Sequence, residues 1–210
     1  CEEVIRSVNP DRIFLDATAS GIRVQGINNY STAIFDSRSW YGPSELGLLV
    51  IKDKSLWSNP LPHLNAAHPN FEASLPLLLA SAVAIENFSS EVEEANMRAR
   101  KFNSQLRDSF DQIPDVDIAG SLDSSLPHLL SASFLNCNGE ELLRGIQGDG
   151  FSVDSGSACT ADNLEPSHVL AAMGVLTHGN IRITIHPDAT QSEIDGLISS
   201  VKNNVERLRA

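Results

Sequence analysis

Hydrophobic residues in the first third of the chain fall into short, unbroken runs that are separated by loops. The first run covers 12–15 and ends at Asp16, the second covers 32–35 and ends at Asp36, and the third covers 46–51. Runs of this kind are typical of strands that are buried on both faces of a parallel or mixed sheet. No periodic helical segment separates them, so the sequence predicts an incomplete α/β sheet whose crossover helices come from elsewhere.

The pattern becomes helical after residue 71. Residues 75–88 are small and apolar, and residues 92–113 carry apolar side chains at helical spacing among charged ones. This change of character places a hinge between two domains within residues 60–90.

The second half of the chain alternates strands and helices. The pattern predicts strands at 129–135, 151–153 and 181–185, and a helix at 140–147 that ends at Gly148. The last helix is the best marked, because Thr190 followed by Glu193 predicts a capping box. Its apolar face consists of Ile194, Leu197, Ile198, Val201, Val205 and Leu208.

Composition and charge narrow the class of protein. The 210 residues are 41% hydrophobic and 20% charged, as in ordinary globular proteins, and suffice for one domain or two small ones. A net charge of −12 argues against nucleic-acid and anionic-membrane partners, because both bind clustered Lys and Arg. The longest apolar run, 75–85, is interrupted and falls short of the roughly 20 residues that a membrane helix needs. We therefore expect no nucleic-acid partner and no membrane partner.

The cysteines and histidines indicate a reducing compartment without a metal site. Three widely spaced cysteines do not form a disulfide framework, which favours a cytoplasmic protein. Six histidines show neither HExxH spacing nor paired cysteines nearby, so no metal site is expected. The chain begins with Cys1 rather than methionine, and we expect it to be processed or a piece of something longer.

The most unusual segment is 154–161, which reads Asp-Ser-Gly-Ser-Ala-Cys-Thr-Ala. It places Cys159 among small residues, between the strand at 151–153 and a helix expected to begin near Pro166. A cysteine is a nucleophile only as the thiolate, and an exposed position near a helix N-terminus lowers the pKa of the thiol. Taken alone, the segment is also compatible with an exposed loop that happens to contain a cysteine.

Several segments in a fixed order carry a resemblance to a known family. Leu-Glu-Pro-Ser-His-Val-Leu at 164–170 follows the cysteine segment closely. The other matching segments are Leu15-Asp-Ala-Thr-Ala19, Tyr41-Gly-Pro43, Leu130-Ser-Ala-Ser-Phe-Leu135, Asn180-Ile-Arg-Ile-Thr184 and Ser192-Glu-Ile-Asp195. Together they resemble the cysteine desulfurases of the NifS/IscS type, which are pyridoxal-phosphate (PLP) enzymes of fold type I and belong to the class V aminotransferases. The first half of that family has no counterpart here.

The resemblance implies an α/β fold, namely the end of the large-domain sheet of fold type I plus the small C-terminal α/β domain. The expected domains are a remnant of the PLP-binding large domain at 1–72, a linking helix at 73–90, and a small domain carrying the cysteine loop at 91–210.

The resemblance also implies roles for three residues. Cys159 would take sulfur from a cysteine–PLP adduct and become a persulfide. Arg182 would bind the substrate carboxylate, and Asp16 would pair with the pyridine nitrogen of PLP. Without the resemblance, Arg182 is equally well a surface or salt-bridged arginine, and Asp16 is equally well the start of a turn.

The cofactor-binding segment departs from the family pattern. The segment 36–43 reads Asp-Ser-Arg-Ser-Trp-Tyr-Gly-Pro, which puts Ser39 where the family has the lysine that holds PLP. Asp36 stands where a serine would contact the cofactor phosphate, and Arg38 replaces a histidine. The implied cofactor-binding residues are therefore Asp16, Ser37, Arg38 and Ser39, the last without the chemistry of a lysine.

The resemblance implies PLP-dependent release of sulfur from L-cysteine, which would leave alanine and a persulfide on Cys159 for iron–sulfur or thio-cofactor assembly. Its implied partners are L-cysteine, a sulfur-acceptor protein, and either a second copy or an N-terminal partner chain. Because Ser39 removes the tether, we expect this chain alone to be a poor desulfurase. The alternatives are an active enzyme completed by another chain, an inactive pseudoenzyme or docking module, a persulfide carrier, and another class V aminotransferase-type enzyme.

Overall fold

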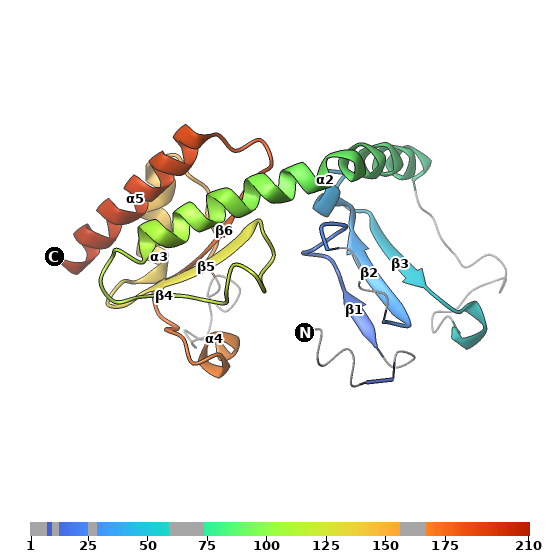
Figure 1. Cartoon of the computed structure of the whole chain (residues 1–210), viewed down its shortest axis with the longest axis horizontal. Helices are drawn as coiled ribbons and strands as arrows, with labels where there is room; N and C mark the ends of the chain where they lie inside the picture. The colour runs from blue at the N-terminus through green and yellow to red at the C-terminus, as the bar shows by residue number, and fades with distance from the viewer. Residues whose placement is uncertain (1–7, 10–12, 25–28, 59–73, 156–166) are drawn as a thin grey trace. The chain divides into compact units, whose positions relative to one another are not determined.

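The computed structural model describes residues 8–9, 13–24, 29–58, 74–155 and 167–210. The chain divides into two compact units, Cys1–Glu93 and Glu94–Ala210, which are called unit 1 and unit 2 below. Figure 1 shows the elements of each unit.

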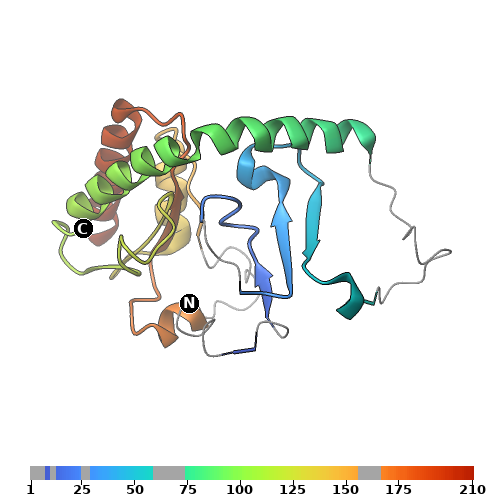
Figure 2. The same cartoon turned by 45° about the vertical axis from the view of Figure 1, so that its right-hand side comes forward.

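Unit 1 contains a mixed three-stranded sheet. Its strands are β1 (Phe14–Asp16), β2 (Thr32–Asp36) and β3 (Gly47–Ile51), in the order β1-β2-β3. β1 pairs with β2 in parallel, and β2 pairs with β3 antiparallel (Figure 2). The mixed sheet predicted from the three apolar runs is therefore confirmed, but the expected burial on both faces is not, since Phe14, Leu49 and Val50 are exposed. Short 3-10 helices follow β2 and β3, at η2 (Ser37–Trp40) and η3 (Lys54–Leu56).

The first part of helix α2 (Leu75–Phe110) packs on η2 within unit 1. Ser81 in α2 accepts hydrogen bonds from the hydroxyl of Ser37 at 3.0 Å and from the indole N–H of Trp40 at 3.1 Å. The ring of Tyr41 meets the ring of Phe88 edge-on, with 5.3 Å between centroids. These contacts fix the conformation of the turn that carries the predicted cofactor segment.

Helix α2 is one continuous element, whereas the sequence predicted two helical segments around residue 90. The polar residues at the junction do not break it, because they are satisfied inside the helix. Ser89 donates to the carbonyl oxygen of Ile85 at 2.6 Å, and Ser90 donates to that of Asn87 at 2.7 Å. The boundary between the two units falls within this helix.

By length and composition alone, α2 is also capable of crossing a membrane, since its most apolar window has a mean hydropathy of 1.2. The core helix of a soluble protein meets the same criteria. Only 17% of that window is buried, and a single helix of this kind among the described residues is weak evidence for a membrane span.

Unit 2 is an antiparallel sheet with helices packed on one face (Figure 1). The strands β4 (Val116–Ile118), β5 (Leu129–Phe134) and β6 (Asn180–Thr184) lie in that order. The helices packed there are the second part of α2, α3 (Gly139–Gly148) and α5 (Gln191–Arg209), whereas α4 (His168–Ala172) contributes no residue to the core. The core contains Phe102, Leu106, Phe110, Leu130, Ala132, Phe134, Leu142, Ile146, Ile181, Ile183, Val201 and Val205.

The segment 151–153 is not a strand, although its pattern predicted one. The amide of Phe151 donates to the carbonyl oxygen of Ile146 at 3.1 Å and so caps the end of α3 instead of joining a ladder. Only Asp154 pairs with the sheet, in an isolated bridge to Arg182. β4 was not predicted, because its three residues are too few to show an alternation.

The capping box of α5 is confirmed. The side chain of Thr190 accepts from the amide of Glu193 at 3.3 Å, and the carboxylate of Glu193 accepts from the amide of Thr190 at 2.8 Å. Of the predicted apolar face, Ile194, Leu197, Val201 and Val205 are buried, and Ile198 and Leu208 pack partly buried against the same core.

Candidate functional site

The predicted site residues lie in both units, and Cys159 lies outside the described residues. Asp16, Ser37, Arg38 and Ser39 belong to unit 1, and Arg182 belongs to unit 2. Each group is described within its own unit.

Asp16 ends β1 as an exposed carboxylate with local partners. It accepts hydrogen bonds from the hydroxyl of Thr18 at 2.6 Å and from the amide of Thr18 at 3.0 Å. These two bonds hold the pKa of the Asp16 carboxyl below its usual value, the hydroxyl bond contributing most. An ionised carboxylate of this kind is able to pair with a protonated pyridine nitrogen, and the Thr18 bonds are also those of an ordinary turn.

Asp36 and Arg38 bind each other across the start of η2. The carboxylate of Asp36 accepts from the Arg38 amide at 2.9 Å, which caps η2, and from the Arg38 guanidinium at Nε and at an Nη. The guanidinium bond lowers the pKa of the Asp36 carboxyl and raises that of Arg38. Arg38 therefore already has an anionic partner on its own chain.

Ser37 and Ser39 both use their hydroxyl groups inside the protein. Ser37 is fully buried and donates to Ser81, so the structure gives it a packing role. Ser39 donates to the carbonyl oxygen of Asp36 at 2.7 Å. A Cβ atom built on Gly21, whose φ is +52°, would overlap the Ser39 hydroxyl, so the two backbones approach closely here.

These residues do not fit a covalently held PLP. Serine forms no imine, and no lysine is among the described residues that line the neighbouring cavity of about 440 Å³, which borders β2, β3 and the turns beside them. Its described lining carries two carboxylates, those of Asp36 and Glu45, and a single cation, the guanidinium of Arg38. A phosphate group, which carries a charge of about −2 near neutral pH, would be repelled by this net negative set. No chemical step through PLP is therefore assigned to the described residues of this chain.

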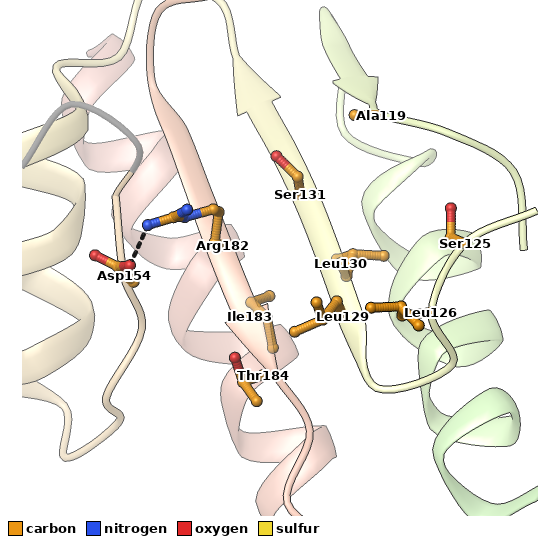
Figure 3. Close-up of a pocket in the computed structure, with 10 residues that line it drawn as sticks. All are labelled: Ala119, Ser125, Leu126, Leu129, Leu130, Ser131, Asp154, Arg182, Ile183 and Thr184. Atoms are coloured by element: carbon orange, nitrogen blue, oxygen red, sulfur yellow. Dashed lines mark hydrogen bonds and ion pairs between the residues drawn. The ribbon is translucent and has the colours of Figure 1, made fainter. Parts of the chain in front are cut away.

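Arg182 lies on β6, on the face of the sheet opposite the core. Its guanidinium binds the carboxylate of Asp154, and the two residues also exchange backbone hydrogen bonds of 2.9 and 2.7 Å. Both side chains are about half exposed, at 51% and 60%. In Figure 3 the Arg182 guanidinium turns towards Asp154 on the segment beside β6.

The Arg182–Asp154 pair borders a cavity of about 460 Å³ on this face of unit 2. The other lining residues are apolar or carry hydroxyl groups: Ala119, Ser125, Leu126, Leu129, Leu130, Ser131, Ile183 and Thr184 (Figure 3). The described lining thus offers one cation and one anion, already bound to each other.

Sequence reasoning missed Asp154 as a functional residue. It was only the first residue of the cysteine segment, and its partner Arg182 lies 28 positions later. Since the contact depends on a single isolated bridge, no periodic pattern signals it. The signal that could have indicated the pair was the charge of its members. Asp154 is the only acidic residue in 150–161, and Arg182 is the only charged residue of β6.

On the far side of the cysteine segment the chain enters α4. The helix begins at His168, two residues after the expected Pro166, and Ser167 caps it by accepting from the amide of Leu170 at 3.4 Å. Among the described residues no group of three or more His, Cys, Asp or Glu is arranged to hold a metal ion.

Comparison with known proteins identifies related sequences and structures. The aminotransferase class-V family model matches residues 33–197. Cysteine desulfurase IscS of Ruthia magnifica subsp. Calyptogena magnifica is 31% identical over 182 residues, which are 83% of this chain and 45% of the relative. Cysteine desulfurase IscS of Vibrio cholerae serotype O1 is 33% identical over 177 residues, or 81% of this chain and 43% of the relative. The chain therefore spans about half the length of the curated relatives it matches.

Solved structures show the same fold. A NifS-like protein from Rickettsia africae has a TM-score of 0.76 at 19% identity and covers 92% of this chain and 53% of its own. Cysteine desulfurase CsdA from Escherichia coli has a TM-score of 0.73 at 19% identity, covering 92% of this chain and 51% of its own. Another NifS-like protein has a TM-score of 0.72 at 26% identity and covers 85% of this chain and 47% of its own. These neighbours confirm the fold type I architecture expected from the sequence.

Proposed function

Because this chain belongs to the aminotransferase class-V family, we propose that it is a cysteine desulfurase-like protein whose Cys159 receives sulfur that originates from L-cysteine. The observation that carries the proposal is the anchoring of the cysteine segment beside Arg182. Asp154, five residues before Cys159, is joined to Arg182 by two backbone hydrogen bonds. A chain of five residues spans at most about 18 Å, and we propose that this short connection lets the Cys159 thiol reach the Arg182 cavity.

The sulfur transfer is an exchange that needs no oxidant or reductant. The Cys159 thiolate attacks the terminal sulfur of a donor persulfide and forms a new S–S bond. The S–S bond of the donor breaks, and the donor leaves as a thiolate, so one sulfur atom moves and the oxidation levels of donor and acceptor exchange. Cys159 then carries a persulfide that a second thiol can take in the same way.

The cofactor step is assigned to a separate enzyme. PLP would supply the cleavage of the carbon–sulfur bond of L-cysteine, but Ser39, Asp36 and Glu45 argue against its attachment here. We therefore propose that a PLP-loaded cysteine desulfurase is the sulfur donor and that a protein of iron–sulfur or thio-cofactor assembly is the acceptor. The setting proposed for this exchange is the cytoplasm, with the chain in a homodimer or with an N-terminal partner chain. The proposal keeps the expected domain limits, with the large-domain remnant at 1–72, the linking helix at 73–90 and the small domain at 91–210.

The test is transfer of labelled sulfur. The purified chain is incubated with an active cysteine desulfurase and L-cysteine labelled in its sulfur, and the label is located by peptide mass spectrometry without reduction. We expect one added sulfur atom on the peptide that contains Cys159 and none in Cys159→Ser. The matched control is Cys137→Ser, which keeps the label because Cys137 is only 5% exposed in the core of unit 2.

Two outcomes would contradict the proposal. Absence of label from Cys159 would overturn its role as the sulfur acceptor. Label that appears with PLP and L-cysteine alone, without the added desulfurase, would show that this chain performs the cofactor step itself.

A further inference from the structure

The guanidinium of Arg182 is held by a carboxylate of its own chain. Asp154 binds it side chain to side chain, and the backbones of the two residues are joined by hydrogen bonds of 2.9 and 2.7 Å. The backbone bonds hold the carboxylate beside the guanidinium (Figure 3), so little further conformational freedom is lost when the ion pair forms. Arg182 is therefore a carboxylate-binding group whose carboxylate is already supplied.

Among the described residues that line the cavity beside this pair, Arg182 is the only cation that an entering anion could bind. Leu126 and Leu129 provide apolar walls, and Ser131 and Thr184 provide hydroxyl groups. A ligand with a carboxylate must displace Asp154 from Arg182 or accept a position next to a like charge. A ligand without a free carboxylate meets neither obstacle.

We propose that Asp154 is a specificity-determining residue that keeps free amino-acid carboxylates out of the Arg182 cavity. The site then favours a cysteine residue within a polypeptide, whose carboxyl group is part of a peptide bond, over free L-cysteine. The inference rests on the proposed function in one respect: if Cys159 accepts sulfur, the donor that this site admits is a persulfide on a protein.

Chemical modification of Arg182 measures this competition directly. Phenylglyoxal, which reacts with guanidinium groups, is added to the full chain, and modification of the Arg182 peptide is followed by mass spectrometry. The protecting ligands are L-serine, which has the carboxylate of L-cysteine but no thiol, and L-serinamide, in which an amide replaces that carboxylate. The variant is Asp154→Asn, which removes the charge and keeps the shape.

We expect the L-serine concentration that halves modification of Arg182 to fall about two- to five-fold in Asp154→Asn, as for the loss of an exposed ion pair. L-serinamide, which has no carboxylate to compete with Asp154, should protect Arg182 to the same extent in both proteins. Glu140→Gln is the matched control, because it removes one carboxylate from the exposed pair between Arg144 and Glu140 in the same unit. It should leave the protection of Arg182 unchanged.

Equal protection by L-serine in the wild type and in Asp154→Asn would overturn the proposal, as would a gain of protection by L-serinamide in Asp154→Asn as large as the gain by L-serine. Asp154→Ser gives a second reading with a smaller side chain, and hydrogen exchange at the Arg182 amide shows whether the backbone bridge persists in both variants. No sulfur is transferred in this experiment. A failure of Cys159 to accept sulfur therefore contradicts the proposed function and leaves the result at Arg182 standing.

Discussion

Ser39 donates its hydroxyl hydrogen to the carbonyl oxygen of Asp36 at 2.7 Å and so closes the short turn after β2. Gly21 packs so closely against this hydroxyl that any Cβ there would overlap it. The position at which the family resemblance expects a PLP lysine is thus built around a short side chain. The turn also holds the Asp36–Arg38 ion pair. The positions where the family resemblance expects the PLP lysine and the phosphate-binding residue are thus occupied by side chains that bond within the turn.

Restoring the lysine alone should restore little of the cofactor attachment. Ser39→Lys supplies the amine but leaves the Asp36 carboxylate facing the phosphate. In Asp36→Ser combined with Ser39→Lys, serine still caps η2 while the charge is gone. We expect about five-fold more PLP fixed on residue 39 in the double variant than in Ser39→Lys, the factor for one like-charge contact in water.

The measurement is borohydride reduction followed by peptide mass spectrometry. Lys52 directly follows β3, and Lys54 is the first residue of η3. Both lysines are present in every variant and serve as internal controls, since their labelling should not change. Equal labelling of residue 39 in the single and double variants would show that Asp36 does not oppose the phosphate.

Local sequence signals predicted most of the elements but not the pairings that define the candidate site. The strand in the apolar run at 46–51 and the capping box at Thr190 could be predicted, because residues close together in the sequence determine them. Ser37 was assigned to the cofactor, yet its hydroxyl is used by Ser81, 44 residues later. The partner of Arg182 was equally beyond reach, since a single bridge carries no periodicity.

Two of the three glycines of α3, Gly145 and Gly148, should respond differently to alanine. In a helix, Gly→Ala normally stabilises by about 1 kcal/mol. At Gly145, however, the new Cβ would overlap Oδ1 of Asn204, which is buried and whose amide binds Asp149 at 2.9 Å. We expect Gly145→Ala to lower the free energy of unfolding by about 1–3 kcal/mol, as other overpacked sites do.

Gly148→Ala is the matched control, because it ends the same helix and no atom lies within 4 Å of the position that the methyl group of alanine would take. It should be neutral or stabilise by up to about 1 kcal/mol. Urea unfolding is followed by far-UV circular dichroism and by hydrogen exchange of α3 and α5, since Trp40 and Trp57 both lie in unit 1. A stabilising Gly145→Ala would contradict the close contact between α3 and α5.

Thr190→Ala should loosen the start of α5. The substitution removes the acceptor for the amide of Glu193, and the loss of an N-cap costs about 1 kcal/mol. Hydrogen exchange should become faster in the first turn of the helix, at Glu193 and Ile194. Ser199→Ala, which removes an exposed hydroxyl from the middle of α5, is the control and should leave exchange at the first turn unchanged. Equal effects of both substitutions would argue against a specific cap.

The carboxyl group of Glu193 should make the stability of α5 depend on pH. The amide and hydroxyl of Thr190 both donate to it and hold the pKa of Glu193 below its usual 4.5. A carboxyl group whose pKa is lower in the folded than in the unfolded state stabilises the fold above the unfolded pKa, and this contribution is lost as the pH falls through the folded pKa. Glu193→Gln keeps the size of the side chain and an oxygen that can accept from Thr190, but its amide does not titrate. We therefore expect wild type to exceed Glu193→Gln in urea midpoint at about pH 7, and the difference between the two midpoints to shrink as the pH falls below 4.5. A difference that stays constant over this range would show that the charge of Glu193 contributes nothing to the cap.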